Sequence, residues 1–223
     1  MSSKVSEILN ILKRTFKISL NEFLAYKVAM ETWDPFETLV ATILTQNTSE
    51  RNAFRAYFNL KKHYPILKPE ILSKASISEL SKLISVGGLG NVKAKRIIEA
   101  SRYVLEKLNG DLWKLLKLGI KARDKLIKIP GVGFKTADIL LLMIAKEPTI
   151  PVDTHIMRVA YRLGISERKG YETVRRALMC NLRRSEYLEA HLYFIMLGRR
   201  YCLARKPKCS KCPVRHLCAK KIK

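Results

Sequence analysis

The sequence predicts an all-α fold. Apolar residues recur at helical spacing along most of the chain, no stretch shows sustained two-residue alternation, and the intervening segments are short. These patterns indicate about ten helices joined by short turns. Hydrophobic residues make up 48% of the 223 residues, which is enough for a core that folds without cross-links.

The helical stretches carry distinct patterns. Residues 36–44 have apolar side chains at i, i+3, i+4, i+7 and i+8, and residues 53–58 and 187–197 carry further apolar stripes. Ser76 and Glu79 form a capping-box pattern that predicts the start of another helix.

The charge of the chain indicates a polyanionic partner. It has 43 basic against 19 acidic residues, a formal net charge of +24. The basic residues are spread along the chain rather than gathered in a tail. A heat-stable surface also uses many lysines but normally matches them with glutamates, so nucleic acid is the favoured partner.

An anionic membrane is the weaker alternative. The longest apolar run, at 139–145, is far shorter than the ~20 residues of a spanning helix, and no apolar signal core follows Lys4. We therefore expect an intracellular protein of the cytoplasm or nucleoid with no membrane partner. In that compartment, clustered cysteines are better explained as metal ligands than as disulfides.

Two segments, 83–94 and 126–137, share one pattern: an apolar helix end, a glycine-containing turn, and a helix rich in Lys and Ala. In the second segment Pro130 ends the first helix, while Gly131 and Gly133 permit positive φ and leave no Cβ in the way. The N–H groups of the turn then lie at the start of the next helix, where they suit a phosphate oxygen. Such a contact positions a DNA backbone but reads no sequence.

A Gly-X-Gly turn alone also fits an ordinary corner between helices, but the string Ile-Pro-Gly-Val-Gly-x-Lys-Thr-Ala at 129–137 is far more specific. It resembles the helix-hairpin-helix glycosylase superfamily and, within it, the endonuclease III family. The resemblance runs from about residue 30 to the C-terminus, with four motifs in the family's order. It implies two helical domains flanking a DNA-binding cleft, and a C-terminal iron–sulfur loop. The DNA contacts that it implies in the hairpin are Gly131, Val132, Gly133 and Thr136.

In that family, a lysine at the position of Lys135 is the nucleophile of the bifunctional enzymes. Its neutral amine would attack C1′ of the sugar, displace the base and form an imine, which permits β-elimination of the 3′ phosphate. A phosphate-binding lysine in a first helical turn would be the simpler interpretation without the motif. The motif favours the catalytic role.

The stretch 151–159 resembles the family's Val-Asp-Thr-His segment, whose aspartate is essential. The resemblance implies that Asp153 stabilises the developing oxocarbenium sugar or helps to activate the nucleophile. The same side chain also suits the N-cap of the next helix, which would fix the direction of the carboxylate. For His155 both a DNA contact and a structural role are open.

A glycosylase extrudes its base from the stack, so the vacated space needs a filler. Residues 43–47 correspond to the family's Leu-Leu-Ser-Ala-Gln motif, which supplies one filler. Direct alignment puts Asn47 at the glutamine position, and Gln46 beside it is the alternative. Leu89 matches an apolar wedge of the family, although a contact that merely closes the turn is the competing interpretation. Gly90 replaces a larger residue and is expected to loosen this turn.

Four cysteines near the C-terminus have the spacing x6, x2 and x5: Cys202, Cys209, Cys212 and Cys218. Four thiolates on a compact loop suit a [4Fe–4S] cluster or a zinc ion, but zinc sites usually have two close cysteine pairs and only one is present. The spacing resembles that of endonuclease III relatives and implies a structural [4Fe–4S] cluster, with basic side chains on its loop that bind DNA. Cys180 stands in an apolar helical pattern and is expected to be buried.

We expect two domains. Residues 29–147 would form a central helical-barrel domain with the hairpin at 126–137. Residues 1–28 and 148–223 would form a second domain around the iron–sulfur loop at 202–218.

The resemblance implies a monomeric base-excision-repair glycosylase that removes oxidised or otherwise damaged pyrimidines from duplex DNA and also cleaves abasic sites. One alternative is a monofunctional mismatch or alkylated-base glycosylase of the same superfamily, which Lys135 disfavours. The other is a non-catalytic DNA-binding iron–sulfur module, in which Lys135 and Asp153 would be dispensable.

Overall fold

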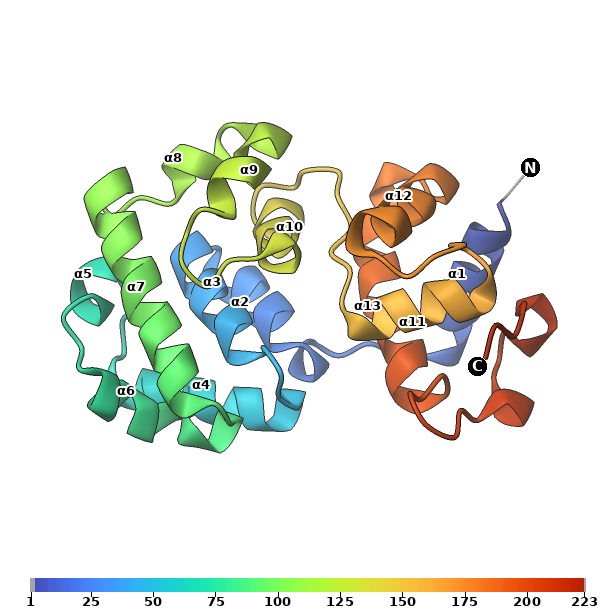
Figure 1. Cartoon of the computed structure of the whole chain (residues 1–223), viewed down its shortest axis with the longest axis horizontal. Helices are drawn as coiled ribbons and strands as arrows, with labels where there is room; N and C mark the ends of the chain where they lie inside the picture. Colours follow the sequence, from blue (N-terminus) through green and yellow to red (C-terminus); the bar gives the residue numbers. More distant parts are fainter. Residues whose placement is uncertain (1–2, 223) are drawn as a thin grey trace. The chain divides into compact units, whose positions relative to one another are not determined.

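The computed structural model describes residues 3–222, and within them the chain forms helices and turns but no strand (Figure 1). The predicted all-α class is confirmed. Thirteen α-helices lie in these residues, and three of them are single turns of four residues. The remaining ten match the number expected from the apolar stripes.

The chain divides into two compact units. Unit 2 comprises Ser19–Glu147, and unit 1 combines Met1–Ile18 with Pro148–Lys223. The first division falls at residue 18, ten residues before the expected boundary. The reason is that helix α2, Leu24–Thr32, packs against α3, Pro35–Leu44, and therefore belongs to unit 2.

Unit 2 is built around two buried helices. Asp34 begins α3, because its Oδ1 accepts hydrogen bonds from the backbone N–H groups of Phe36 and Glu37 at 2.7 and 2.9 Å. Every residue of α3 is buried, and α10, Phe134–Met143, packs against it. The other helices of the unit are α4 Glu50–His63, α5 Pro69–Leu72, α6 Ile77–Ile84, α7 Gly90–Leu108, α8 Trp113–Leu116 and α9 Arg123–Leu126.

The longest helix of unit 2, α7, packs against α3, α5 and α6. Its buried stripe includes Ala94, Ile97 and Val104, each with no exposed surface. Full burial of a side chain as large as Ile97 stabilises the fold by about 1.5–3 kcal/mol. Since α7 spans the unit, it provides a common support for several loops.

The described residues of unit 1 form four α-helices: α1 Lys4–Thr15, α11 Thr154–Leu163, α12 Tyr171–Asn181 and α13 Tyr187–Arg200. The apolar helix α13 contacts both α1 and α11, and the cysteine loop follows it directly. This loop contains two short 3₁₀ turns, at Cys209–Lys211 and Arg215–Leu217. Among residues 3–222, no helix has the length and apolarity that crossing a membrane requires.

Candidate functional site

The hairpin at 126–137 connects α9 to α10. The N–H of Val132 donates to the carbonyl of Ile129 at 3.0 Å, and Gly131 adopts a φ of 78°. A Cβ at Gly131 would lie 2.9 Å from the Cβ of Arg96 on α7. Both the backbone conformation and the packing against α7 therefore require a glycine here.

Gly133 differs from Gly131. Its φ is −100° with an extended ψ, a conformation open to any residue, so the positive φ that a glycine permits is not used at this position. A Cβ here would meet no atom within 4 Å, and no side chain caps the start of α10. The first N–H groups of α10 thus lie beside open space at the positive end of the helix dipole.

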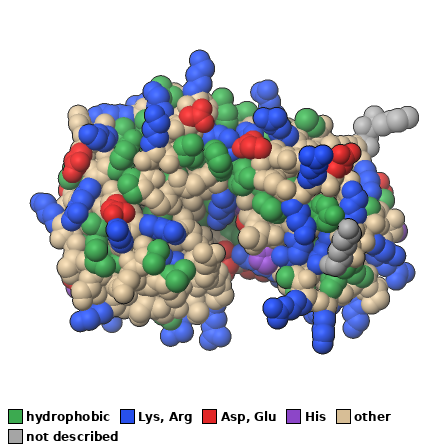
Figure 2. Space-filling model, in the orientation of Figure 1, with side chains coloured by type: hydrophobic (Ala, Val, Ile, Leu, Met, Phe, Trp, Pro, Cys, Tyr) green, Lys and Arg blue, Asp and Glu red, His purple; other side chains and the backbone are tan. Residues whose placement is uncertain are grey.

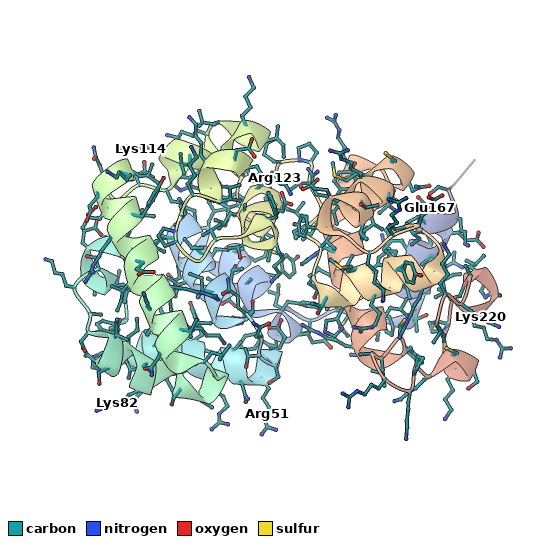
Figure 3. All side chains as sticks on the ribbon, in the orientation of Figure 1. Arg51, Lys82, Lys114, Arg123, Glu167 and Lys220 are labelled. Atoms are coloured by element: carbon teal, nitrogen blue, oxygen red, sulfur yellow. The ribbon has the colours of Figure 1, made fainter. Side chains whose placement is uncertain are left out.

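The side chains of Val132 and Thr136 point into the core, since both are buried. Only their backbone atoms are available to a ligand at the hairpin. The two helices are also joined by an ion pair between Arg123 and the fully buried Asp138, with Nε–Oδ1 and Nη2–Oδ2 distances of 2.8 and 3.0 Å. Arg123, the first residue of α9, is labelled in Figure 3.

Lys135 is the second residue of α10 and is half-buried. The preceding residue, Phe134, exposes its ring although it is a large apolar side chain. A lysine in the first turn of a helix without a side-chain cap is suited to contact a ligand that carries phosphate groups.

Gln46 supports the hairpin from the loop after α3. Its Nε2 donates to the carbonyl of Gly131 at 3.1 Å, and its Oε1 accepts from Nη1 of Arg96 at 2.6 Å. Asn47, in contrast, is exposed and has a φ of 49°. Of the two alternatives for a gap-filling residue, Asn47 is the more exposed.

The turn at 85–90, here called the wedge turn, presents Leu89. This leucine has a φ of 54° and is 51% exposed. The left-handed conformation costs a leucine about 1–2 kcal/mol, so a local constraint must hold it. Gly90 does not loosen the turn as expected: a Cβ there would lie 2.8 Å from Oγ and 3.0 Å from the carbonyl oxygen of Ser81, so α6 and α7 meet closely at this glycine.

Lys93 is a functional candidate that the sequence analysis did not identify. It is 1% exposed, and its Nζ donates to the carbonyls of Leu44 and Gly87 at 2.8 and 2.9 Å. Burial and the neighbouring Arg96 lower the pKa of Lys93 to about 8. A signal was present, because Lys93 precedes Ile97 by four residues and so lies on the apolar stripe of α7.

Asp153 begins α11 in unit 1. Its Oδ1 accepts a hydrogen bond from the N–H of Ile156 at 2.7 Å, so the predicted N-cap is confirmed. His155 packs against α13 so closely that a Cβ added to Gly198 would lie 2.8 Å from the Cβ of His155. The Nδ1 atom of His155 lies 3.1 Å from Nη2 of Arg158. Burial lowers the pKa of His155, which keeps the ring neutral at pH 7. These contacts favour the structural interpretation of His155.

Two arginines on α11 fasten the cysteine loop. Arg158 donates from Nε to the carbonyl of Cys202 at 2.8 Å. Arg162 donates to the carbonyls of Leu203 and Ala204 at 2.6 and 3.1 Å, and its Nη1 lies 3.6 Å from Sγ of Cys202. These arginines also escaped the sequence analysis, although their i, i+4 spacing places them on one face of the helix.

The four cysteines of the loop are free thiols that line one cavity, which Arg162 and Tyr201 also border. Within residues 3–222, no three acidic, histidine or cysteine side chains converge closely enough to hold a single metal ion. Thiols arranged around a cavity suit a cluster in which each iron takes one cysteine better than they suit one zinc ion. Burial raises the pKa of the Cys212 thiol.

The surface of the cysteine loop is basic. The side chains of Lys206, Lys208, Lys211 and Arg215 are all exposed. Lys and Arg side chains also greatly outnumber acidic ones on the face that Figure 2 shows. Cys180 is exposed, and the expectation that it packs in the core is wrong.

The hairpin and the cysteine loop together define a class of DNA repair proteins. Residues 40–184 match the HhH-GPD superfamily of base excision DNA repair proteins. Residues 202–218 match the iron–sulfur binding domain of endonuclease III. The predicted iron–sulfur cofactor is thereby confirmed.

Within this class, the chain belongs to the endonuclease III family, which confirms the resemblance seen in the sequence. It is 34% identical over 209 residues to endonuclease III of Sulfolobus acidocaldarius, covering 93% of this chain and 92% of that protein. It is also 34% identical over 190 residues to endonuclease III of Escherichia coli K12, covering 85% of each chain.

Solved structures have the same fold. A trapped endonuclease III–DNA covalent intermediate is 28% identical with a TM-score of 0.76, over 99% of this chain and 97% of that one. A thermostable thymine-DNA glycosylase reaches the same TM-score at 23% identity, over 97% and 94% of the chains. This second likeness concerns the fold alone.

Proposed function

We propose that this chain is a bifunctional DNA glycosylase of base excision repair, which removes damaged pyrimidines from duplex DNA and cleaves the abasic site. The observation that carries the proposal is Lys135 in the first turn of α10, a helix whose N-cap residue, Gly133, provides no side-chain cap and has open space around it. The trapped covalent complex of a similar endonuclease III supports it, because such a complex needs a nucleophilic side chain.

The reaction follows from the amine of Lys135. Its nitrogen bonds to C1′ of the damaged nucleotide, and the glycosidic bond breaks with its electron pair going to the base, which takes up a proton. The C1′–O4′ bond then opens, O4′ is protonated and an imine remains. Loss of a C2′ proton moves electrons into a C2′=C3′ double bond, and the 3′ phosphate leaves.

Asp153 acts on the same deoxyribose in this proposal. Its carboxylate stabilises the positive charge that develops on the sugar as the base departs. The N-cap hydrogen bond from Ile156 to Oδ1 supports this role, since it fixes the direction of the carboxylate. Asp153→Asn keeps the cap and removes the charge, so we expect it to fold normally and to lose activity.

The remaining site residues bind DNA, hold the cluster or support the elements that do so. Backbone groups of residues 131–136 contact a phosphate, and Asn47 and Leu89 fill the space that the extruded base leaves. Gln46 positions the hairpin rather than filling the gap, and His155 supports α11. The proposed cluster ligands are Cys202, Cys209, Cys212 and Cys218.

Borohydride trapping tests the nucleophile. The chain is incubated with duplexes that contain thymine glycol or an abasic site, and borohydride reduces the imine to a stable covalent adduct. We expect an adduct with the wild-type chain and with Lys128→Ala, a control at an exposed lysine of the same hairpin, but none with Lys135→Ala.

The outcomes separate the alternatives. Base release without an adduct indicates a monofunctional glycosylase, and DNA binding with neither indicates a non-catalytic module. An adduct that persists in Lys135→Ala moves the nucleophile to another residue. Iron analysis tests the ligands: about four irons per chain and an absorption band near ~400 nm are expected, whereas stoichiometric zinc would exclude the cluster.

A further inference from the structure

Lys93 is a costly residue at its position on α7. It is 1% exposed, and its helical neighbours Ala94 and Ile97 are fully buried apolar residues. A charged amine loses its hydration when it is buried, so an apolar side chain of similar size would suit this core better. The fold of unit 2 therefore gives no reason for a lysine here, and its contacts must supply one.

The contacts of Lys93 join two loops. Nζ donates to the carbonyl of Leu44, the last residue of α3, and to the carbonyl of Gly87 in the wedge turn. Carbonyls at a helix end lack an intrahelical partner, so a lysine is well placed to satisfy the one at Leu44. Asn47 follows the first acceptor by three residues, and Leu89 follows the second by two.

Both loop tips hold an exposed side chain on a left-handed backbone. The φ angles of Asn47 and Leu89 are 49° and 54°. Residues in such conformations keep them only where the surroundings restrict the chain. Lys93 restricts the bases of both loops at once through a single nitrogen atom.

A second link runs along the same helix. Arg96, one turn after Lys93, holds Gln46, and Gln46 in turn holds the carbonyl of Gly131 in the hairpin. Three loops that are far apart in sequence thus meet on one face of α7. All of these contacts lie within unit 2.

We propose that Lys93 is a positioning residue for base extrusion, which ties the Asn47 loop to the wedge turn so that the two gap-filling side chains enter the DNA as one unit. This inference rests on the proposed glycosylase function. It assigns Lys93 no contact with the substrate. Removing its amine should therefore impair extrusion from duplex DNA more than it impairs the chemistry at Lys135.

Lys93→Met tests the proposal, because methionine has a similar length but no N–H donor. Lys146→Met is the matched control: Lys146 also donates from Nζ to a carbonyl at a helix end, that of Met143 at 2.8 Å, and burial also lowers its pKa. That carbonyl belongs to α10 and leads to neither gap-filling loop. Two rates are measured for each variant: single-turnover removal of thymine glycol from a duplex, and borohydride trapping on a single-stranded abasic oligonucleotide.

We expect Lys93→Met to slow removal from the duplex by about 10- to 100-fold, the effect of a small misplacement of positioning groups. Trapping on the single strand, where no base is extruded from a stack, should stay within about twofold. Lys146→Met should leave both rates near the wild-type values. Equal losses on both substrates, or an unchanged duplex rate, would overturn the proposal, whereas a wild-type chain that traps neither substrate contradicts the proposed function instead.

A second measurement tests the proposal even if the Lys93→Met variant does not fold. In the wild-type background, Asn47→Ala, Leu89→Ala and the double variant form a double-mutant cycle on the duplex rate. Loop tips that act as one unit give a double variant about as slow as the slower single variant. Rate losses that multiply would show that the two tips act independently and would overturn the proposal.

Discussion

The wedge turn and the hairpin share one sequence pattern but expose different parts of the chain. In the hairpin, Gly133 stands beside open space, and the start of α10 offers backbone N–H groups. In the wedge turn, Gly90 is packed against Ser81, and the exposed element is the side chain of Leu89. One turn leaves backbone N–H groups without a side-chain cap beside open space, and the other projects an apolar side chain.

The packing of the hairpin gives the largest expected change in stability. Gly131→Ala forces an alanine into a φ of 78° and places its Cβ 2.9 Å from the Cβ of Arg96. We expect the free energy of unfolding to fall by about 2–4 kcal/mol, from backbone strain and overpacking together. Urea unfolding followed by circular dichroism measures this change.

Gly133→Ala is the matched control for that variant. Its stability should stay within about 0.5 kcal/mol of the wild type, because φ is −100° and a Cβ meets no neighbour. Its affinity for duplex DNA should nevertheless fall by about tenfold if a phosphate approaches this glycine. Equal stability losses in both variants would contradict the contrast between the two glycines.

Lys93, which binds the wedge turn, gives the second largest expected change in stability, and this change depends on pH. The folded-state pKa of Lys93 is about 8, below the ordinary value of 10.5, so between these values the unfolded chain binds more protons than the folded chain. Stability must therefore rise with pH from about 8 to 10.5, by at most about 1.4 kcal/mol per pH unit from this group. Below pH 8 the destabilisation by the buried ammonium is fully present.

Comparison with Lys93→Met isolates this contribution from the other titrating groups. The thermal midpoint of the wild type should rise relative to that of the variant between pH 7.5 and 9.5, by about 2–4 °C for each kcal/mol in a chain of this size. A difference between the two midpoints that stays constant with pH would contradict the shifted pKa.

The smallest stability effect is expected at the tip of the wedge turn. Leu89→Gly relieves the left-handed strain but adds the entropy of a glycine, so the free energy of unfolding should change by no more than about 1 kcal/mol. Removal of a damaged base from the duplex should still slow by about tenfold or more. Val92→Ala, at another exposed apolar residue in the first turn of α7, should change neither quantity.

Local patterns were enough to predict much of the fold. Helical periodicity depends on neighbouring residues, and the string at 129–137 contains the glycine that precedes α10. The expectation that Pro130 ends the preceding helix is wrong, because α9 already ends at Leu126. The cysteine loop is also local, since its four thiols lie within seventeen residues, 202–218. The N-cap role of Asp153 follows from the same kind of pattern.

Features that depend on contacts between distant segments could not be predicted in this way. The apolar stripe of α7 indicates that Lys93 is buried, but its hydrogen bond to the carbonyl of Leu44, 49 residues away, depends on how α3 and α7 pack. Cys180 was misplaced because it follows the buried Leu178 by two residues, about 200° around the helix, and so faces solvent. The contact of Gln46 with Gly131, which lies 85 residues away, could not be predicted either.

Three loops of this enzyme are held in place by Lys93 and Arg96 of α7, either directly or through Gln46. This arrangement limits how the loops can be re-engineered or can diversify. If the loop after α3 were moved into another protein by itself, it would lose Lys93 and Arg96, because both residues belong to α7. The transferable unit is therefore the helix together with the three loops that it carries. Lineages that acquire new lesion preferences in this fold should change these four segments in concert.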